Sequence, residues 1–213
     1  QLTTGKFNHE GDFCWAPDSR FILVSANRHE NYEFDPANYE IYDVNIQDKS
    51  ITPLTSRQGP DFNPAVSPDG KLIAYVGFDD RYQFYQVFSL YIMNRDGSSP
   101  RQILNSLDRD VEYIKWSSDS KGIYFQYDDK GNTWIAYSDL NVNVSKISDN
   151  VGGLSLDRPY SGGRFTVSST GRFAFTYSRT DRPSDLASAY KGIKEIKPIT
   201  SVNDDLFQHK KPG

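Results

Sequence analysis

The chain has 213 residues, of which 37% are hydrophobic and 14% aromatic, and its formal net charge is −4. A mildly acidic chain with mixed charges gives no reason to expect phosphate neutralisation, so we expect no nucleic-acid partner. No apolar run approaches the roughly 20 residues that span a bilayer, and the polar start shows no signal-peptide pattern. The sequence therefore predicts a soluble chain with no membrane partner. The compartment stays open between the cytoplasm and, after loss of a signal peptide, the periplasm or the exterior.

The cysteine and histidine content argues against a metal site. Cys14 is the only cysteine, which excludes an internal disulfide and a four-cysteine zinc site. Its neighbours Phe13 and Trp15 favour buried packing over a reactive thiol. The histidines show no His-Glu-x-x-His spacing, and His29 lies in a polar run that reads as a loop. We therefore expect neither a metal nor a cofactor. The three histidines are His9, His29 and His209.

A segment with a Ser-Pro-Asp-Gly-like turn recurs four times along the chain. Its equivalent turn residues are spaced by 51, 50 and 51 positions: Pro17, Pro68, Ser118 and Ser169. A second landmark, a short segment that reads as the last strand of each repeat, recurs at a similar period. Its central residues are Leu2, Leu54, Ile103, Ile147 and Ile199. Four antiparallel strands in a period of about 40–50 residues are typical of β-propellers.

The sequence predicts an all-β fold, a β-propeller with about four four-stranded antiparallel blades that form part of a larger ring of six to eight blades. In chain order the expected blades cover residues 5–55, 56–105, 106–148 and 149–200. Within the second blade the expected strands cover 62–66, 71–77, 88–94 and 100–104. The first residues, 1–3, read as the end of a preceding blade, and 201–213 reads as a linker towards a C-terminal domain.

Three long inserts, 27–39, 78–87 and 149–163, are expected to open on one face of the propeller, where binding usually occurs on a rigid scaffold. We expect this face to meet another domain or a substrate. The second insert contains Arg81-Tyr-Gln-Phe-Tyr85, one cation and three aromatic residues in a loop. Arg81, Tyr82 and Tyr85 are therefore candidates for substrate contact, with packing against a neighbouring domain as the alternative.

We find no catalytic residues in the sequence. The Gly-x-Ser-x-Gly elbow of α/β-hydrolases does not occur. Trp15 and Trp116 hold equivalent positions in the repeat, so we expect both in the blade core. Three carboxylate pairs lie at expected turns and read as solvated residues: Asp79-Asp80, Asp128-Asp129 and Asp204-Asp205. Whether the chain takes part in an enzyme therefore depends on a parent protein.

Several stretches resemble the blades of TolB-like propellers, namely 15–20, 65–75 and 90–97. The order of features is similar to the N-terminal propeller of the prolyl oligopeptidase family, in its acylaminoacyl-peptidase and dipeptidyl-peptidase branch. The most specific passages are Thr180-Asp-Arg-Pro-Ser-Asp-Leu186 and Ile199-Thr-Ser-Val-Asn-Asp-Asp-Leu206, which resemble the passage that closes the propeller before the hydrolase domain in that branch.

The resemblance implies a non-catalytic domain that gates and selects short peptides for a serine peptidase, whose α/β-hydrolase domain would follow Gly213. The family's catalytic triad has no matching positions in this chain. The paired-glutamate anchor of some dipeptidyl peptidases has no counterpart either, because Glu112 beside Tyr113 stands alone. The alternative is a stand-alone TolB-like propeller that serves as a protein–protein interaction module. A glycosidase-like propeller is disfavoured, since the first strands 62–66 and 164–167 carry no acidic residue.

Overall fold

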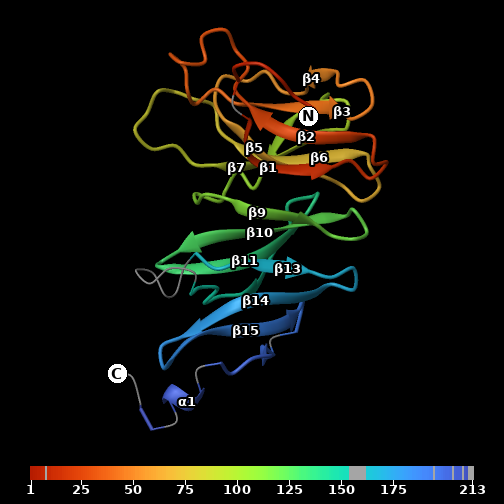
Figure 1. The fold of residues 1–213 in the computed structure, drawn as a ribbon. Helices are drawn as coiled ribbons and strands as arrows, with labels where there is room; N and C mark the ends of the chain where they lie inside the picture. Colours follow the sequence, from red (N-terminus) through yellow and green to blue (C-terminus); the bar gives the residue numbers. More distant parts are fainter. Residues whose placement is uncertain (8, 154–161, 194, 203, 208, 211–213) are drawn as a thin grey trace. The chain divides into compact units, whose positions relative to one another are not determined.

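The computed structural model describes residues 1–7, 9–153, 162–193, 195–202, 204–207 and 209–210. The chain divides into two compact units, Gln1–Ser120 and Lys121–Gly213, and each is treated by itself below. The sheets are antiparallel, have four strands each and follow the order of the chain (Figure 1). This confirms the prediction of an all-β fold built from four four-stranded units.

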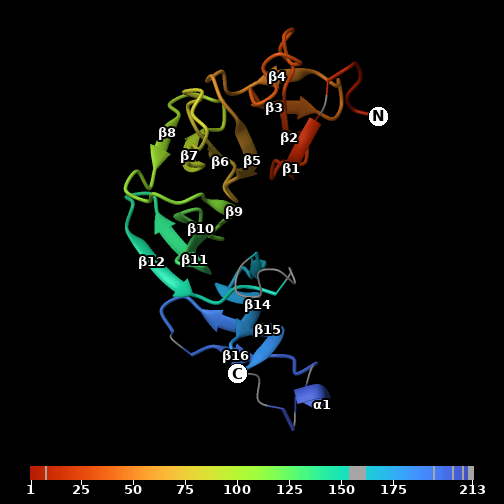
Figure 2. The same cartoon turned by 90° about the vertical axis from the view of Figure 1, so that its left-hand side faces the viewer.

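The strands of the first two sheets alternate in direction along the chain. The first sheet contains β1 (His9–Trp15), β2 (Phe21–Ala26), β3 (Glu40–Asn45) and β4 (Ile51–Pro53). The second contains β5 (Asp61–Val66), β6 (Leu72–Gly77), β7 (Ser89–Asn94) and β8 (Arg101–Ile103). The four strands expected from the second repeat are thus confirmed. Figure 2 shows this sheet from β5 at one edge to β8 at the other.

The remaining strands form two further sheets of the same order. The third sheet contains β9 (Glu112–Trp116), β10 (Gly122–Asp129), β11 (Asn132–Asp139) and β12 (Val144–Ser148). The fourth contains β13 (Phe165–Val167), β14 (Arg172–Arg179), β15 (Arg182–Tyr190) and β16 (Lys197–Pro198). A four-residue helix, α1 (Asp204–Phe207), lies in the segment expected to be a linker. No helix among the described residues is long and apolar enough to cross a membrane.

The turn between the first and second strands has one geometry in all four repeats. Its fourth residue has a positive φ in each case: 58° at Ser19, 73° at Gly70, 59° at Ser120 and 79° at Gly171. The amide of this residue donates to the carbonyl three positions earlier, at 2.8–3.0 Å. Glycine adopts this left-handed conformation without a Cβ penalty, which explains why two of the four repeats carry it. The repeat seen in the sequence is therefore a repeat of backbone conformation.

In the first unit, the core lies between the first two sheets. Its fully buried side chains come from both: Ala16, Leu23, Ile41, Ile73, Tyr75 and Met93. Cys14 packs against this cluster, and burial raises the pKa of its thiol, so the prediction of a packing role is confirmed. Near the end of the sheets that carries the β1–β2 and β5–β6 turns, which we call the turn-bearing end, Arg95 Nη2 lies 2.8 Å from Asp43 Oδ2 and joins the two sheets. Hydrophobic packing and one partly buried ion pair thus hold neighbouring blades together.

The two repeat-equivalent tryptophans differ in burial. Trp116 is 9% exposed, and its indole N–H donates to the carbonyl of Ala65 on β5 at 2.8 Å. Trp15 is 54% exposed, and Phe13 on the same side of β1 is 71% exposed. The prediction of a core position is therefore correct for Trp116 and wrong for Trp15. The reason is physical: Trp116 lies against β5 of the neighbouring sheet, whose Ala65 carbonyl accepts its indole N–H, whereas more than half of the surface of Trp15 contacts solvent.

Aromatic rings form much of the core of the second unit. The ring of Phe173 on β14 packs edge-on against Tyr124 on β10, with centroids 4.8 Å apart, and also contacts Phe165. Phe125 and Phe175 are fully buried. Aromatic pairs in this geometry add to the free energy gained by burial alone. The high aromatic content noted in the sequence therefore serves packing between sheets.

Candidate functional site

Two of the three long inserts lie at the same end of the first unit. Because the strands alternate in direction, the β2–β3 loop (27–39), the β6–β7 loop (78–88) and the β4–β5 connection (54–60) leave their sheets at one end. Figure 1 shows both loops projecting there, while the short β1–β2 and β5–β6 turns lie at the opposite end. We call this the loop-bearing end. Residues 154–161 of the third insert lie outside the described residues.

The β4–β5 connection lies between the two loops and bonds to both. The side-chain amide of Gln58 donates to Asp35 Oδ2 at 2.8 Å, and the amide of Gly59 donates to Asn38 Oδ1 at 3.1 Å. On the other side, the amide of Asp80 donates to the carbonyl of Gln58 at 2.9 Å. A Cβ at Gly59 would lie 2.2 Å from the carbonyl oxygen of Phe78, and its φ is 130°. Only glycine permits this close approach.

Arg57 is the charged centre of this connection. Its guanidinium contacts Asp61, whose side chain is fully buried, and reaches Asp79 in the β6–β7 loop at 3.3 Å. It also lies over the ring of Tyr91, 4.1 Å from the ring centroid. The Nε of Arg57 and the Oδ2 of Asp61 are buried and have no protein hydrogen-bond partner. Arg57 thus contacts two carboxylates, while one of its own nitrogens and one oxygen of Asp61 are buried without a protein hydrogen bond.

Glu40 is a second buried carboxylate beside this ion pair. Its side chain is 3% exposed, accepts a hydrogen bond from Thr55 Oγ1 at 2.5 Å and lies 3.6 Å from Nε2 of His29. Burial raises the pKa of Glu40 to about 7, against the opposing effect of the Thr55 hydrogen bond. Burial likewise raises the pKa of Asp61 to about 6, although Arg57 opposes the shift. The loop-bearing end therefore contains two carboxyl groups that gain or lose protons near neutral pH.

The β6–β7 loop organises itself through its own side chains. The amide of Arg81 donates to Gln86 Oε1 at 2.8 Å, and Gln86 donates in turn to Asp80 Oδ1 at 2.8 Å. The amide of Tyr82 donates to the same Asp80 oxygen at 2.7 Å. Phe84, at the tip, is completely exposed, and Tyr82 is 80% exposed. Internal hydrogen bonds thus present two aromatic rings to solvent in a defined loop.

A cavity of about 350 Å³ lies beside this loop. It is lined mainly by polar side chains: Asp79, Arg81, Gln83, Tyr85, Gln86, Ser89, Tyr91, Gln102 and Asp108. Arg81 and Tyr85 line it, as the sequence interpretation would require of substrate-contacting residues, whereas Tyr82 does not. The hydroxyl of Tyr85 donates to Asp110 Oδ2 at 3.1 Å, which ties the loop to the β8–β9 connection. Amide, carboxylate, phenol and guanidinium groups can hold a polar ligand.

The three carboxylate pairs were expected at turns, but only Asp79-Asp80 lies in a loop, whereas Asp128-Asp129 ends β10 and Asp204-Asp205 begins α1. Several of their members have specific partners. Asp79 pairs with Arg57, Asp128 accepts a hydrogen bond from Thr133, and Asp204 pairs with Arg182. Over the described ranges, no three His, Cys, Asp or Glu side chains gather in a way that could hold a metal ion. The pairs therefore act in local structure, and their arrangement gives no catalytic assignment.

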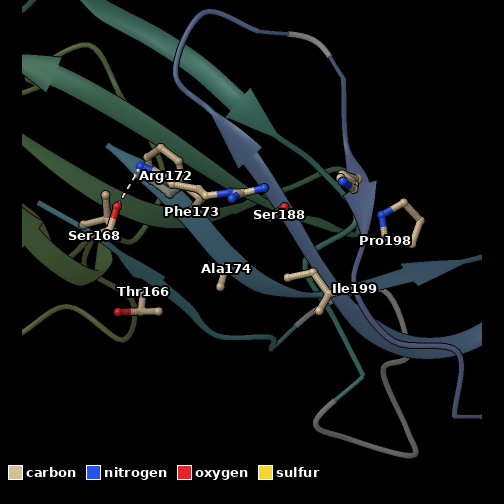
Figure 3. Close-up of a pocket in the computed structure, with 10 residues that line it drawn as sticks. Thr166, Ser168, Arg172, Phe173, Ala174, Ser188, Pro198 and Ile199 are labelled. Carbon is tan, nitrogen blue, oxygen red and sulfur yellow. Dashed lines mark hydrogen bonds between the residues drawn. The ribbon is translucent and has the colours of Figure 1, made fainter. Parts of the chain in front are cut away.

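A larger cavity, of about 630 Å³, lies on one face of the fourth sheet in the second unit. Figure 3 shows Thr166, Ala174 and Ser188, which lie opposite one another on adjacent strands, along this face. None of the described residues that line it is a histidine, and the one hydrogen bond drawn, from the amide of Arg172 to Ser168 Oγ at 3.1 Å, closes the β13–β14 turn. We therefore assign no chemistry to the described lining of this cavity.

The sequence interpretation missed the buried polar residues of the loop-bearing end. Glu40 and Thr55 gave no signal, since a glutamate at a strand end and a threonine after a strand are usually solvated. Asp61 gave a partial sequence signal, because an aspartate recurs near the start of the repeated segment, as at Asp110. Both of these aspartates bond to loop residues, Asp61 to Arg57 and Asp110 to the amide of Phe88. A repeated aspartate was thus the available clue.

Comparison with known proteins places the fold. No protein-family model matches the chain. A curated relative, dipeptidyl-peptidase 5 from Porphyromonas gingivalis, is 28% identical over 141 residues, which cover 58% of this chain and 20% of the relative. The chain thus spans about a fifth of the length of this relative. Two fungal dipeptidyl-peptidase 5 sequences from Arthroderma otae match at 26% identity over 129 residues, 55% of this chain and 18% of theirs.

Solved structures agree on the architecture. An acylaminoacyl peptidase superposes with a TM-score of 0.68 at 18% identity over 93% of this chain and 28% of its own. TolB from Acinetobacter baumannii gives a TM-score of 0.65 at 17% identity over 93% of this chain and 45% of its own. An oligogalacturonate lyase gives 0.71 at 11% identity, over 93% and 55% of the two chains. At these identities the likeness shows the fold alone, and function must be argued from the site. The chain is a β-propeller segment of four blades, similar to TolB-like proteins and to the propellers of acylaminoacyl, prolyl and dipeptidyl peptidases.

Proposed function

We propose that this chain is the propeller domain of a serine peptidase of the acylaminoacyl- or dipeptidyl-peptidase type, in which it gates and selects short peptide substrates. The observation that carries the proposal is the sequence match to dipeptidyl-peptidase 5, which extends over more than half of the chain. The partner is then an α/β-hydrolase domain of the same polypeptide, joined through residues 201–213. The chain supplies no nucleophile or base, and its contribution is to control access.

The loop-bearing end is the part of the described chain best suited to this role. It carries two long loops braced by one connection, a polar cavity beside Arg81 and Tyr85, and exposed aromatic tips at Tyr82 and Phe84. Rigid scaffolds commonly carry binding residues on such loops. In the proposed role Arg81 and Tyr85 contact peptide groups within the cavity. The exposed rings of Tyr82 and Phe84 contact the hydrolase domain or the substrate.

The first test is the sequence of the gene beyond the codon for Gly213. The proposal expects a Gly-x-Ser-x-Gly elbow followed by aspartate and then histidine. A stop codon shortly after Gly213 would contradict it and would favour a TolB-like interaction module. The purified natural protein should then cleave chromogenic N-acylated amino acids or dipeptides and leave a long unfolded protein intact. Equal cleavage of both substrates would contradict gating while leaving the peptidase assignment in place.

Variants of the cavity test the assigned residues. Arg81→Ala and Tyr85→Phe should each lower kcat/KM for short peptides by roughly 2- to 10-fold, the effect of losing one or two hydrogen bonds. Arg20→Ala is the matched control, since Arg20 is an exposed arginine at the turn-bearing end and pairs with Asp18. Wild-type kinetics in both cavity variants would remove these residues from the substrate site.

A further inference from the structure

The segment that follows the last strand is bonded to the sheet. Thr200 Oγ1 accepts a hydrogen bond from the amide of Leu186 at 2.9 Å and donates to Asp185 Oδ1 at 2.7 Å. The same Asp185 oxygen accepts a second hydrogen bond, from the amide of Val202 at 3.0 Å. Further along, Asp204 pairs with Arg182. Three successive points of residues 200–204 are therefore attached to β15.

These contacts bring together the two passages that carry the most specific resemblance in the sequence, 180–186 and 199–206. A cavity of about 250 Å³ between them is lined from both sides, by Arg182, Asp185 and Leu186 on β15 and by Thr200 and Asp204 beyond β16. Asp185 receives both hydrogen bonds on a carboxylate, and such charge-assisted bonds are about twice as strong as neutral ones. The two passages thus form one structural element.

The first unit contains the same arrangement. Thr55 Oγ1 accepts from the amide of Ile41 at 2.9 Å and donates to Glu40 at 2.5 Å. The sequence separations, 14 and 15 residues, are the same as those in the second unit. There the chain continues within two residues to Arg57, whose partner Asp61 begins β5. In the first unit, the threonine–carboxylate contact therefore lies at the start of the β4–β5 connection, and the ion pair of Arg57 with Asp61 holds the residues that follow it.

We propose that the described residues of 199–207 form a strap, fastened to β15 of the fourth sheet by Asp185 and Arg182, which fixes the course of the chain after its last strand. The strap differs from a flexible linker in a measurable way: its backbone is held by the bonds to Asp185 and by the ion pair of Asp204. The inference does not depend on the proposed function, because it concerns the strap's attachment and not any substrate.

Hydrogen exchange of the full chain, followed by mass spectrometry, tests the strap. In the wild type, the amides of Leu186, Ile199, Thr200 and Val202 should exchange slowly, since each donates a hydrogen bond. Asp185→Ala should accelerate exchange in peptides covering 199–207 by about tenfold or more, and leave peptides covering 165–179 unchanged. Asp185→Asn, which keeps one acceptor oxygen, should retain part of the protection.

A matched control and a charge swap complete the experiment. Asp181→Ala removes an aspartate from the β14–β15 hairpin of the same sheet, where it pairs with neighbouring Arg179, and should not affect 199–207. Arg182→Asp should accelerate exchange at 203–207, and the double variant Arg182→Asp with Asp204→Arg should restore protection. Exchange in wild-type 199–207 as fast as in Asp185→Ala would overturn the strap. So would equal acceleration in Asp181→Ala and Asp185→Ala.

Discussion

The hydroxyl of Thr55 donates a 2.5 Å hydrogen bond to the carboxylate of Glu40, which is buried beneath the loop-bearing end. Thr200 makes the equivalent bond to Asp185 in the last blade, where the carboxylate is only partly buried. The bonding is the same in the two units, but the surroundings differ. Since a buried polar group costs most when it loses its partner, the two contacts should differ in energy.

Removing each hydroxyl should reveal this difference. Thr55→Val keeps the shape of the side chain and removes the hydroxyl that donates to the buried Glu40 and accepts from the amide of Ile41. We expect a loss of about 1–3 kcal/mol of unfolding free energy. Thr200→Val should cost no more than about 1 kcal/mol, because water can replace the hydroxyl there. Urea unfolding at pH 7 measures both. An equal or greater loss for Thr200→Val would contradict the assignment of burial as the cause.

Stability should depend on pH through Glu40, which is surrounded by His29, Thr55, Arg57 and Asp61. Its pKa is raised from 4.5 to about 7 by burial, so the folded state holds a proton that the unfolded state releases. The resulting stabilisation is fully present below about pH 4.5 and is lost as the pH rises through 7. Asp61, with its pKa raised to about 6, contributes in the same direction.

Glu40→Gln tests this dependence, because glutamine keeps an acceptor for Thr55 and cannot ionise. Between pH 5 and 8, the urea midpoint of the wild type should fall more than that of Glu40→Gln. Glu30→Gln, at an exposed position in the β2–β3 loop, is the control and should follow the wild type. Parallel curves for the wild type and Glu40→Gln would show that Glu40 is ionised throughout this range.

Arg57 should be among the most sensitive charged residues of the first unit. Arg57→Met keeps much of the side-chain volume over Tyr91 but leaves the fully buried Asp61 without its counter-charge. Breaking a buried ion pair in this way costs about 3–5 kcal/mol. The double variant Arg57→Met with Asp61→Asn should recover part of the loss, since the buried charge is then removed. The exposed Arg20–Asp18 pair provides the control, where Arg20→Ala should change stability by less than about 1 kcal/mol.

Much of the fold could be predicted from the sequence, because the repeated turns mark where each blade begins. The Ser-Pro-Asp-Gly-like segments fix one backbone conformation, with a positive φ at Ser19, Gly70, Ser120 and Gly171, and so mark each pair of first strands. Strand order follows, because short connections leave little choice beyond pairing neighbours in sequence. Local chemistry at a repeated position therefore determined the blades.

The candidate site could be predicted only in part, because it depends on contacts between residues far apart in the chain. The loops were visible as inserts, and Arg81 and Tyr85 as unusual residues within one of them. The hydrogen bond from Gln58 to Asp35 joins residues 23 positions apart, and the ion pair of Arg57 with Asp79 joins residues 22 positions apart. A local sequence pattern cannot predict contacts of this kind. Burial of Glu40 arises from the same long-range packing, so neither its partner nor its raised pKa could be anticipated.

The two tryptophans provide the clearest matched pair for testing blade packing. They occupy equivalent positions, but Trp116 is covered by β5 and donates to the carbonyl of Ala65, whereas Trp15 is 54% exposed. Trp116→Ala should cost about 3–5 kcal/mol of unfolding free energy, the usual loss for a buried large aromatic side chain. Trp15→Ala should cost far less in the chain studied by itself, because about half of its surface already contacts water.

Chemical denaturation of the two variants, monitored by circular dichroism because each lacks one fluorescent indole, measures the difference. Trp116→Phe adds a finer test, since it keeps a six-membered aromatic ring but removes the pyrrole part of the indole together with its hydrogen bond to Ala65. Its loss should lie between about 1 kcal/mol, for the hydrogen bond alone, and the loss in Trp116→Ala. If Trp15→Ala destabilises the chain as much as Trp116→Ala, then the exposed side of β1 is covered in solution. A dependence of that loss on protein concentration would identify a second copy of the chain as the cover, whereas a loss independent of concentration would assign it to residues of the same chain.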